Sequence, residues 1–407
     1  MLSVLINAYA CSPNMGSEPG MAWNWCVNLA TYCQLHIITE GEFKSNIETA
    51  LQTLPQAKNM HFYYNSVPEK VRKICWNQGD WRFYKHYKKW QYKTYEIALD
   101  IIAHNKIDIV HQLNMIGFRE PGYLWKIKDI PFVWGPIGGL KQFPILYLKD
   151  GGTKMRLFNL IKNGINKLQL RYSRRVHKAI NHASVLISSI PDSYIAIKKS
   201  FGLETYIIPE TGCFDVEDKQ MHNFNNKTLK LLWVGKFDYR KRLDLALRII
   251  SSLDIDIQLI ICGTGDEKQT TKYKQLCESL KITRKVVWKG SLPNEEVHEL
   301  MSLADLLLFT SVSEDTSTVV LEAITYQLPV LCFNACGFGY VINDKVGRKV
   351  PLTNPIQSID DFTSIIKHLY DNRDEIKTMS DNCIMKANEL SWKNKAKQMF
   401  EIYKQLV

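Results

Sequence analysis

The sequence has neither an apolar run that could cross a bilayer nor a regular cysteine pattern. A membrane-spanning helix needs about 18 consecutive apolar residues, and no stretch approaches that length. The ten cysteines are scattered without a Cys-x-x-Cys pair, which argues against a disulfide framework and against a zinc site. This use of cysteine suits a reducing compartment, so the sequence predicts a cytoplasmic protein.

Two further signatures are missing. No Gly-x-Gly-x-x-Gly follows the first apolar strand, residues 2–8, which argues against a dinucleotide-binding dehydrogenase. No carboxylates are spaced like metal ligands, so the sequence predicts no metal site. The first residues also lack a positively charged segment, and their apolar stretch is short, which favours a β-strand over a signal peptide.

What the sequence does contain is a long alternation of apolar strands and helical segments. Its 407 residues exceed what one hydrophobic core usually serves, so two domains are expected. The alternation predicts an α/β fold built from doubly wound, mostly parallel sheets. A polar, Asn-rich stretch at residues 215–228 is interpreted as the linker between a first domain at 1–214 and a second at 229–390.

Local signals predict several details of these domains. Helices are expected near residues 21–33 and 119–126. The glycine and proline density of residues 135–139 predicts a loop. After residue 351 the chain is expected to be helical, with a last basic and aromatic helix at 391–407.

The stretch from Ser311 to Val330 carries two glutamates, Glu314 and Glu322, between two short apolar strands. Ligands of open α/β sheets bind beyond the carboxyl ends of the strands, and Glu314 falls in such a loop. Ionised carboxylates only accept hydrogen bonds, so they suit ligands with hydroxyl groups. A helix cap and a solvated surface glutamate are the alternative interpretation.

Two other loops contain groups that suit phosphate. Lys236, Arg240 and Lys241 follow the strand at residues 229–234, and cations at such a loop are natural partners of phosphate. The glycine-containing loop around Gly16 precedes a helix, whose first amides attract anions. A solvated basic turn and an ordinary strand–helix loop are the respective alternatives.

Three segments, Ser313-Glu314, Leu321-Glu322-Ala323 and Leu328-Pro329-Val330, together resemble the donor-binding signature of retaining GT-B glycosyltransferases of family 4. The resemblance extends over nearly the whole chain. It implies two Rossmann-like domains facing a central cleft, with the helix at 391–407 returning to the first domain. It further implies a nucleotide-diphosphate sugar as donor and no metal or other cofactor.

The resemblance assigns roles to residues at the matching positions. The implied catalytic residues are Glu314, His111 and Lys241. The implied donor-binding residues are Gly16, Ser17, Lys236, Arg240, Lys241, Gly263, Leu292, Asp315, Thr316, Ser317, Thr318 and Glu322. Residues in neighbouring loops are candidates for the acceptor, namely Asn114, Arg119, Gly138 and Gly139.

Within this assignment Glu314 addresses the sugar hydroxyls, Glu322 the ribose, and the cations the diphosphate. Lys236 stands where the family has an arginine, so Arg240 is expected to share its role. Residues 315–318 replace a usual Gly-Phe-Gly turn, and their backbone amides are expected to face the sugar. His111 ends a strand and matches a histidine near the donor sugar, although a lone histidine there is also commonly structural.

The segments GSEPGMAWNW and FVWGPIGG resemble bacterial enzymes that build capsule or lipopolysaccharide chains. The implied reaction is sugar transfer to a hydroxyl of a glycan, lipid-linked in this setting, with retention of anomeric configuration. A GT-B sugar-nucleotide epimerase is one alternative. A catalytically silent sugar-nucleotide-binding subunit is another, favoured by Lys236 and by the missing Gly-Phe-Gly turn.

Positive charge is concentrated in the first half of the chain. Residues 1–208 hold 26 lysines and arginines against 14 acidic residues, whereas the remainder is nearly neutral. Two basic stretches, 69–93 and 154–178, account for most of this excess, and the second has apolar residues at helical spacing. A basic amphipathic helix is typical of binding to an anionic membrane surface, here the inner face of the cell membrane. The alternative is a helix packed on the sheet with solvated charges, and no motif supports nucleic acid.

Overall fold

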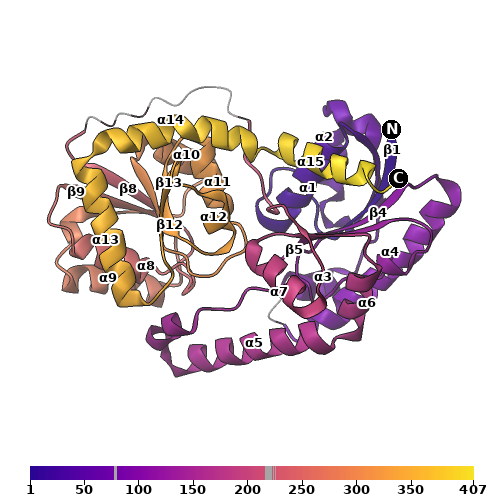
Figure 1. The fold of residues 1–407 in the computed structure, drawn as a ribbon, viewed down its shortest axis with the longest axis horizontal. Coiled ribbons are helices and arrows are strands. Elements are labelled where there is room, and N and C mark those ends of the chain that lie inside the picture. The colour runs from indigo at the N-terminus through magenta and orange to yellow at the C-terminus, as the bar shows by residue number, and fades with distance from the viewer. Residues whose placement is uncertain (78–79, 216–221, 223, 225) are drawn as a thin grey trace. The chain divides into compact units, whose positions relative to one another are not determined.

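The computed structural model describes residues 1–77, 80–215, 222, 224 and 226–407. The chain divides into two compact units (Figure 1). Unit 1 comprises residues 1–140, 164–210 and 392–407, and unit 2 comprises residues 141–163 and 211–391. Part of the predicted linker, 216–221 with 223 and 225, lies outside the described residues.

Unit 1 is built on a seven-stranded sheet whose pairings are all parallel. The strand order is β3-β2-β1-β4-β5-β6-β7, so the chain starts in the middle and adds strands outward on both sides. The strands are β1 (Leu2–Ala8), β2 (Cys33–Thr39), β3 (Met60–Tyr64), β4 (Ile109–Asn114), β5 (Phe132–Ile137), β6 (Val185–Ser188) and β7 (Tyr206–Ile207). A parallel sheet of this kind has to be covered on both faces, because its strands are apolar throughout.

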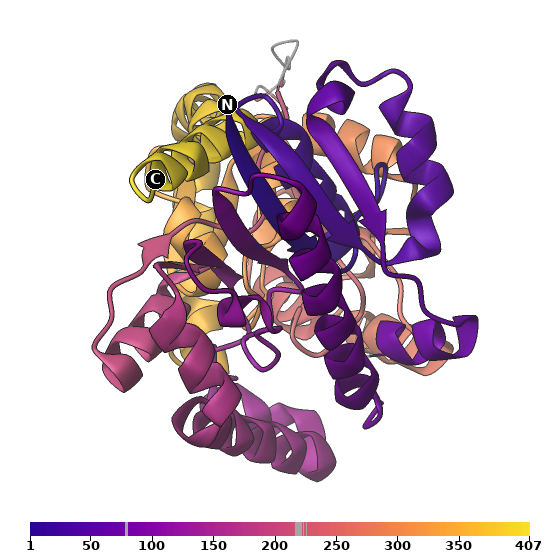
Figure 2. The same ribbon diagram turned by 90° about the vertical axis from the view of Figure 1, so that its right-hand side faces the viewer.

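Two apolar clusters provide that cover in unit 1. Val4 and Ile6 of β1 face a cluster that includes α1 and α15, and Leu5 faces the opposite cluster, which includes α4, α6 and α7. Figure 2 shows this sheet from the side of unit 1. The helices are α1 (Ser17–Leu29), α2 (Lys44–Leu51), α3 (Glu69–Trp76), α4 (Phe83–His104), α6 (Arg174–His182), α7 (Pro191–Phe201) and α15 (Trp392–Lys404).

Unit 2 is built on a six-stranded parallel sheet of order β10-β9-β8-β11-β12-β13. The strands are β8 (Leu229–Val234), β9 (Ile257–Cys262), β10 (Val286–Gly290), β11 (Leu306–Phe309), β12 (Val330–Phe333) and β13 (Gly347–Val350). Both sheets are therefore doubly wound, as the alternation of elements predicted.

The helices of unit 2 form a layer on each face of its sheet. α8 packs with α9 and α13, and α11 packs with α10 and α14 (Figure 1). Local signals explain several helix ends: Asp266 and Gln269 form a capping box before α9, and the Asn354 side chain caps α13, which begins with a proline. The helices are α8 (Leu243–Ser251), α9 (Glu267–Ser279), α10 (Asn294–Leu303), α11 (Thr318–Thr325), α12 (Cys336–Val341), α13 (Pro355–Asp371) and α14 (Arg373–Glu389).

The division into units differs from the predicted domains at residues 141–163, 211–214 and 391, all of which group with unit 2. Residues 141–163, expected in the first domain, group with unit 2, because their aromatic side chains join its core. The buried Tyr147 ring lies 5.9 Å from the Phe333 ring, and its hydroxyl lies 2.6 Å from the Ser358 hydroxyl. α5 (Gly152–Tyr172) contains the boundary at Gly164.

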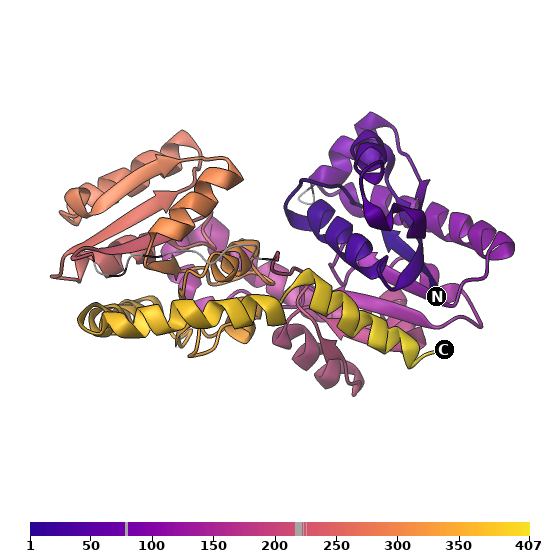
Figure 3. The same cartoon turned by 90° about the horizontal axis from the view of Figure 1, so that it is seen from above.

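The last helix belongs to unit 1. α15 packs beside α1 (Figure 1, Figure 3), where Trp25 and Trp392 meet edge to face at 5.8 Å. Its buried Lys395 ammonium donates to the Pro209 carbonyl at 3.0 Å. Amphipathic spacing thus gives α15 one apolar face, and that face completes the core of unit 1.

Three local predictions need correction. The segment 135–139 is not all loop, since β5 continues through Gly135 and Pro136 to Ile137. A Cβ at Gly135 would lie 2.3 Å from the Ile187 carbonyl oxygen, so glycine is what allows β5 to run so close to β6. The helix expected at 119–126 is only a 3-10 turn at Leu124–Lys126, and α1 begins at Ser17, four residues before the predicted start.

Candidate functional site

The carboxyl ends of β8 and β11 lie side by side in unit 2, and their loops are joined by hydrogen bonds. The Thr310 hydroxyl donates to the Lys241 carbonyl at 2.8 Å and accepts from the Trp233 indole at 3.0 Å. The Val312 amide donates to the Arg240 carbonyl at 2.9 Å. Each loop therefore supports the other, and the side chains they present hold fixed relative positions.

Lys241 and Glu314, predicted from distant stretches of sequence, form an ion pair in this loop pair. The Lys241 ammonium lies 2.5 Å from Glu314 Oε1, and the Ser311 hydroxyl donates to the same oxygen at 2.7 Å. The two side chains are 15% and 13% exposed, so both are shielded and both still reach the surface. The ammonium also lies 5.0 Å from the centre of the Phe309 ring. This cation and carboxylate are the centre of the candidate site.

The other predicted cations are more exposed. Arg240 forms a two-pronged pair with Asp238, with its closest contact at 2.6 Å. That arginine holds the pKa of the Asp238 carboxyl below its usual value, against the effect of burial. Lys236 is exposed on the same loop. Arg240 can thus share a phosphate only by giving up part of its contact with Asp238.

Arg242 belongs to the same loop, and sequence analysis did not single it out. Its backbone is left-handed, with φ of 50°, and its side chain is fully buried. The guanidinium pairs with Asp244 at 2.7 Å and lies between the rings of Tyr147 and Tyr239, 5.4 and 5.2 Å from their centres. Arg242 therefore anchors the basic loop from beneath and is a structural residue.

The segment that replaces the usual glycine turn leads directly into α11. Ser317 has an extended backbone at the N-cap position, and Thr318 begins the helix. The Asp315 carbonyl accepts from the Gly337 amide at 3.1 Å, which ties this segment to α12. Thr316 and Ser317 are buried. The first amides of α11 thus lie next to Glu314 in the chain, where helix N-termini favour anions.

Glu322 lies one helical turn inside α11. Its side chain is half-buried, and burial raises the pKa of its carboxyl above the usual value. Among the residues that the structure describes, no side chain or amide pairs with that carboxylate. A shielded acceptor without a protein donor is suited to a ligand that brings hydroxyl groups.

The loops after β9 and β10 lie next to the loop after β8. Gly263 has φ of 151°, and a Cβ there would lie 1.8 Å from the Gly235 carbonyl oxygen. Its amide donates to the Gly290 carbonyl at 2.6 Å. Burial raises the pKa of the Cys262 thiol, and the nearby Leu292 amide opposes that rise. Only glycine at position 263 permits this close approach, so the predicted Gly263 and Leu292 belong to the same edge of the unit 2 sheet.

In unit 1 the structure brings together the loops after β1, β4 and β5. The Asn114 amide donates to the Ala10 carbonyl at 2.8 Å and to the Glu18 carbonyl at 3.3 Å. The Ile116 amide donates to the Glu18 carboxylate at 3.2 Å, and the Gly138 amide donates to the Ile116 carbonyl at 2.8 Å. Glu18 was missed by sequence analysis, because a glutamate next to proline in a turn carries no distinctive pattern.

The predicted phosphate-loop residues lie at the start of α1. Gly16 occupies the N-cap position, is exposed, and has open space around its Cα. Ser17 has a left-handed backbone with φ of 56°. The two residues thus stand beside the Glu18 and Asn114 contacts at the carboxyl edge of the unit 1 sheet.

His111 is placed differently from its neighbours. It is fully buried, its Nδ1 accepts from the Tyr403 hydroxyl at 2.5 Å, and its Nε2 donates to the Gly135 carbonyl at 2.7 Å. Burial lowers the pKa of the imidazole to about 4. A neutral ring with both nitrogens occupied has no surface for a sugar, so His111 joins β4, β5 and α15. We therefore assign it the structural role and not the catalytic one.

The remaining acceptor candidates are tied to other elements. Arg119 donates to the Gln169 side chain at 3.0 Å and also contacts Asn166, both on α5. Gly138 is buried, and Gly139 has a left-handed φ of 75°. Arg119 is thus held against α5 and does not join the Asn114 contacts.

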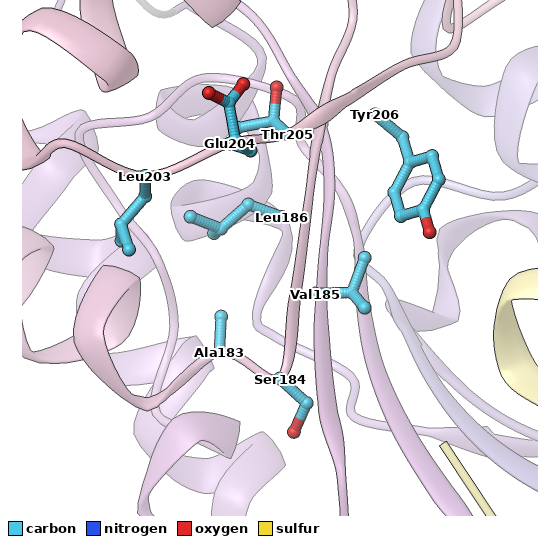
Figure 4. Close-up of a pocket in the computed structure, with 8 residues that line it drawn as sticks. All are labelled: Ala183, Ser184, Val185, Leu186, Leu203, Glu204, Thr205 and Tyr206. Atoms are coloured by element: carbon cyan, nitrogen blue, oxygen red, sulfur yellow. The ribbon is translucent and has the colours of Figure 1, made fainter. Parts of the chain in front are cut away.

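A pocket of about 400 Å³ is also present in unit 1 (Figure 4). It is lined by residues 183–186 and 203–206, which lie at the amino ends of β6 and β7. Ligands of doubly wound sheets bind at the carboxyl ends, so this pocket is not included in the candidate site.

Within the described parts of the chain, no group of three or more His, Cys, Asp or Glu side chains is arranged to hold a metal ion. A search of the same residues finds no helix with the length and apolar content needed to span a membrane.

Comparison with known proteins finds a family model that matches a part of the chain within unit 2. Residues 215–387 match the family model described as glycosyl transferases group 1. Over 128 residues the chain is 32% identical to lipopolysaccharide glucosyltransferase WaaG of Escherichia coli strain K12. That alignment covers 31% of this chain and 33% of WaaG, so the chain spans about a third of the relative's length.

Solved structures resemble the chain over its whole length. The lipopolysaccharide outer core galactosyltransferase WaaB superposes with a TM-score of 0.66, at 16% identity and with 100% of both chains covered. HepE from Anabaena, solved in complex with UDP-glucose, superposes with a TM-score of 0.61, at 13% identity and with 100% of both chains covered. These likenesses, together with the two parallel sheets, establish the predicted GT-B type of fold.

Proposed function

We propose, from the match of residues 215–387 to glycosyltransferase group 1, that this chain is a retaining glycosyltransferase. It transfers a sugar from a nucleotide-diphosphate donor to a hydroxyl of a glycan acceptor. The acceptor is lipid-linked and belongs to surface polysaccharide biosynthesis at the cytoplasmic face of the membrane. The names of WaaG and WaaB, both lipopolysaccharide sugar transferases, support this setting.

The observation that carries the proposal is the Lys241–Glu314 ion pair beside the start of α11. A nucleotide sugar has anionic phosphates next to neutral hydroxyls, and the pair offers a cation next to an acceptor. Since both side chains are mostly shielded from water, their interactions with a ligand are stronger than on an open surface. HepE was solved with UDP-glucose on the same fold, which makes UDP and UDP-sugars the first ligands to test.

Lys241 is assigned to the diphosphate and Glu314 to the hydroxyls of the donor sugar. As the bond from the sugar to the phosphate breaks, negative charge grows on the departing diphosphate, and a preorganised cation lowers the energy of that state. Lys236 supplies a second cation, and Arg240 supplies a third that it shares with Asp238. The amides of residues 315–318 are assigned to the sugar.

Glu322 is assigned to the ribose. Its shielded carboxylate accepts hydrogen bonds from the two ribose hydroxyls, which replaces the water that burial removes. Gly263 and Leu292 are assigned to the loops that border the base. The assignment of Gly16 and Ser17 to the donor diphosphate stays a prediction, as does the absence of a metal.

The acceptor residues also stay predictions. Asn114, Gly138 and Gly139 are proposed because their loops meet at the carboxyl edge of the unit 1 sheet. Arg119 is the weakest of the four, since its guanidinium is engaged with α5.

The first experiment is a thermal-shift screen of nucleoside diphosphates and their sugars. A ligand that binds only the native state raises the unfolding temperature, so a selective shift by one nucleotide identifies the donor class. Turnover is then measured as nucleoside diphosphate released on adding glycan acceptors, with the anomeric configuration of the product read by NMR. Release that requires the acceptor argues against an epimerase, and donor binding without turnover under all conditions indicates a silent subunit.

A further inference from the structure

α5 places most of its apolar side chains on its exposed side, and its buried side consists mainly of asparagines and a glutamine, together with Leu170. An ordinary surface helix shows the reverse arrangement, with an apolar stripe toward the core. The inward stripe of α5 includes Asn159, Asn163, Asn166 and Gln169, all half-buried or buried. α5 therefore does not use its apolar stripe to pack on the protein.

Hydrogen bonds hold the helix in this orientation. The Asn163 side chain accepts from the Phe143 amide at 3.0 Å and donates to the Phe143 carbonyl at 3.1 Å. Arg119 contacts Asn166 and donates to Gln169 at 3.0 Å. A rotation of α5 that turned its apolar residues inward would break these contacts and bury the asparagines without partners.

The outward stripe contains seven large apolar side chains that are 38% to 65% exposed. They are Leu157, Phe158, Leu160, Ile161, Ile165, Leu168 and Tyr172. At 3.6 residues per turn, these positions fall on one continuous side of the helix. Single exposed apolar residues are common on protein surfaces, but a contiguous stripe marks a surface that binds something.

The charges of α5 are all positive. Its five charged residues are exposed cations along the borders and ends of the apolar stripe, and the helix has no acidic residue. The cations are Lys154, Arg156, Lys162, Lys167 and Arg171. Lysine and arginine stems can lie along an apolar surface while their charged ends reach outward to anions.

We propose that α5 docks this protein on an anionic membrane surface. The helix lies in the plane of the interface, with its apolar stripe among the acyl chains and its cations at the lipid phosphates. The inward asparagines stay on the protein side and keep the helix in place. This surface needs no membrane-spanning segment, and it does not depend on the reaction proposed above.

The charge pattern selects this occupant over two others. A second copy of the chain, docking through the same stripe, brings five more cations against the first five, which is unfavourable at close range. A nucleic acid satisfies the cations but leaves the leucines, isoleucines and phenylalanine in water. A lipid surface with acidic headgroups buries the apolar stripe among its acyl chains and brings its phosphates next to the bordering cations.

The apolar stripe is tested by co-sedimentation with vesicles of phosphatidylcholine alone and of phosphatidylcholine mixed with phosphatidylglycerol. The test variant is Leu157→Ser/Phe158→Ser/Ile161→Ser. Its matched control is Leu303→Ser/Ile356→Ser/Met385→Ser, which changes three apolar residues of unit 2 that are at least 64% exposed. We expect the α5 variant to bind the mixed vesicles at least about 100-fold more weakly, with the control unchanged. Equal loss in both variants, or no loss in the α5 variant, overturns the proposal.

The cations are tested with Arg156→Gln/Lys167→Gln/Arg171→Gln, against Lys268→Gln/Lys272→Gln/Lys274→Gln on the exposed side of α9. Each cation near an anionic surface is worth about 1 kcal/mol, so the α5 variant should bind the mixed vesicles roughly 100-fold more weakly. Its binding to phosphatidylcholine alone should not change. An equal effect of the α9 control would show that overall charge matters and would refute a role for α5.

Direct contact with lipid is read from a dye. All ten native cysteines are buried, so a thiol-reactive, polarity-sensitive dye labels Leu168→Cys selectively. Its emission should shift to the blue on mixed vesicles, and the same dye at Leu303→Cys should not respond. Analytical ultracentrifugation tests whether a second copy of the chain binds the stripe instead. If the protein is a dimer that Leu157→Ser/Phe158→Ser/Ile161→Ser dissociates, and the dye does not respond to vesicles, the partner of α5 is a second copy and the membrane proposal is overturned.

Discussion

Lys241→Met tests the centre of the candidate site, because it removes one charge and keeps the shape of the side chain. In the structure the ammonium lies 2.5 Å from Glu314 Oε1 and 5.0 Å from the centre of the Phe309 ring. A methionine of similar length still packs on that ring. The substitution therefore isolates the contribution of the positive charge to phosphate binding.

The expected loss follows from the strength of one charge-assisted contact. Hydrogen bonds to charged groups contribute about 1.5–3 kcal/mol, so UDP should bind roughly 10- to 150-fold more weakly to the variant. Isothermal titration calorimetry with UDP measures this without knowledge of the acceptor. Lys345→Met, at an exposed lysine of the same unit, is the matched control and should bind UDP like the unmodified protein.

Folding should survive the change. Glu314 loses its ion-pair partner but keeps the hydrogen bond from Ser311 at 2.7 Å. Both charged groups reach the surface, so we expect a loss of about 1–2 kcal/mol in the free energy of unfolding, less than for a fully buried pair. Urea unfolding of each variant verifies that the weaker binding is not a loss of native protein.

Glu314→Gln should act in the opposite direction on UDP. It removes a negative charge next to the diphosphate, so UDP should bind equally or more tightly, while UDP-glucose loses the contact to its sugar hydroxyls. Unchanged UDP affinity in Lys241→Met would refute the assignment of the lysine. Equal weakening of UDP by both variants would refute the division of roles between cation and carboxylate.

Three further predictions concern stability and pH. Glu322→Gln should weaken nucleotide binding. It should also raise the free energy of unfolding at pH 7 by on the order of 1 kcal/mol, because burial raises the pKa of the carboxyl and its ionised form opposes folding. That gain should vanish on acidification, when the carboxyl is protonated in both states, and denaturant unfolding at several pH values measures it. Between pH 6.5 and about 4 the buried His111 imidazole stays neutral, whereas the imidazole of the unfolded chain gains a proton, which lowers the free energy of unfolding by roughly 3 kcal/mol. His111→Gln should remove this pH dependence. An unchanged pH profile would contradict the buried position. Gly263→Ala should lower the free energy of unfolding by several kcal/mol and abolish nucleotide binding, because φ is 151° and Gly235 leaves no space for a Cβ. Gly164→Ala in α5, where the Cβ meets open space, should raise the free energy of unfolding by about 0.5–1 kcal/mol. Similar melting temperatures for the two variants would contradict this explanation.

Much of the candidate site was predictable because each part follows an apolar strand. The runs at residues 229–234 and 306–309 identify strands, and in a parallel sheet the groups just after them gather at one edge. From the sequence alone, this rule predicts that Lys241 and Glu314 lie in one region. The rule does not distinguish a surface side chain from a buried one, and so it failed for His111, which is fully buried within β4 because that strand continues to Asn114.

Other features depended on partners that are distant in sequence. Sequence analysis did not single out Arg242, because its role depends on Tyr147, Tyr239 and Asp244, which pack around it only in the folded protein. Residues 141–163 were assigned by their place in the chain, whereas the unit 2 core accepts their aromatic rings. Helical periodicity identified the stripe of α5 but left its direction open.

The sequence by itself determined the order of strands and helices, since alternating apolar periodicity decides which backbone hydrogen bonds each segment can form. It also determined which loops contain cations and carboxylates. Tertiary structure decided which of these groups stay in contact with water, because exposure depends on residues brought close by folding. The clearest case is α5, where hydrogen bonds with Phe143 and Arg119 hold Asn163 and Asn166 on the buried side, while Leu157, Leu160 and Leu168 stay exposed.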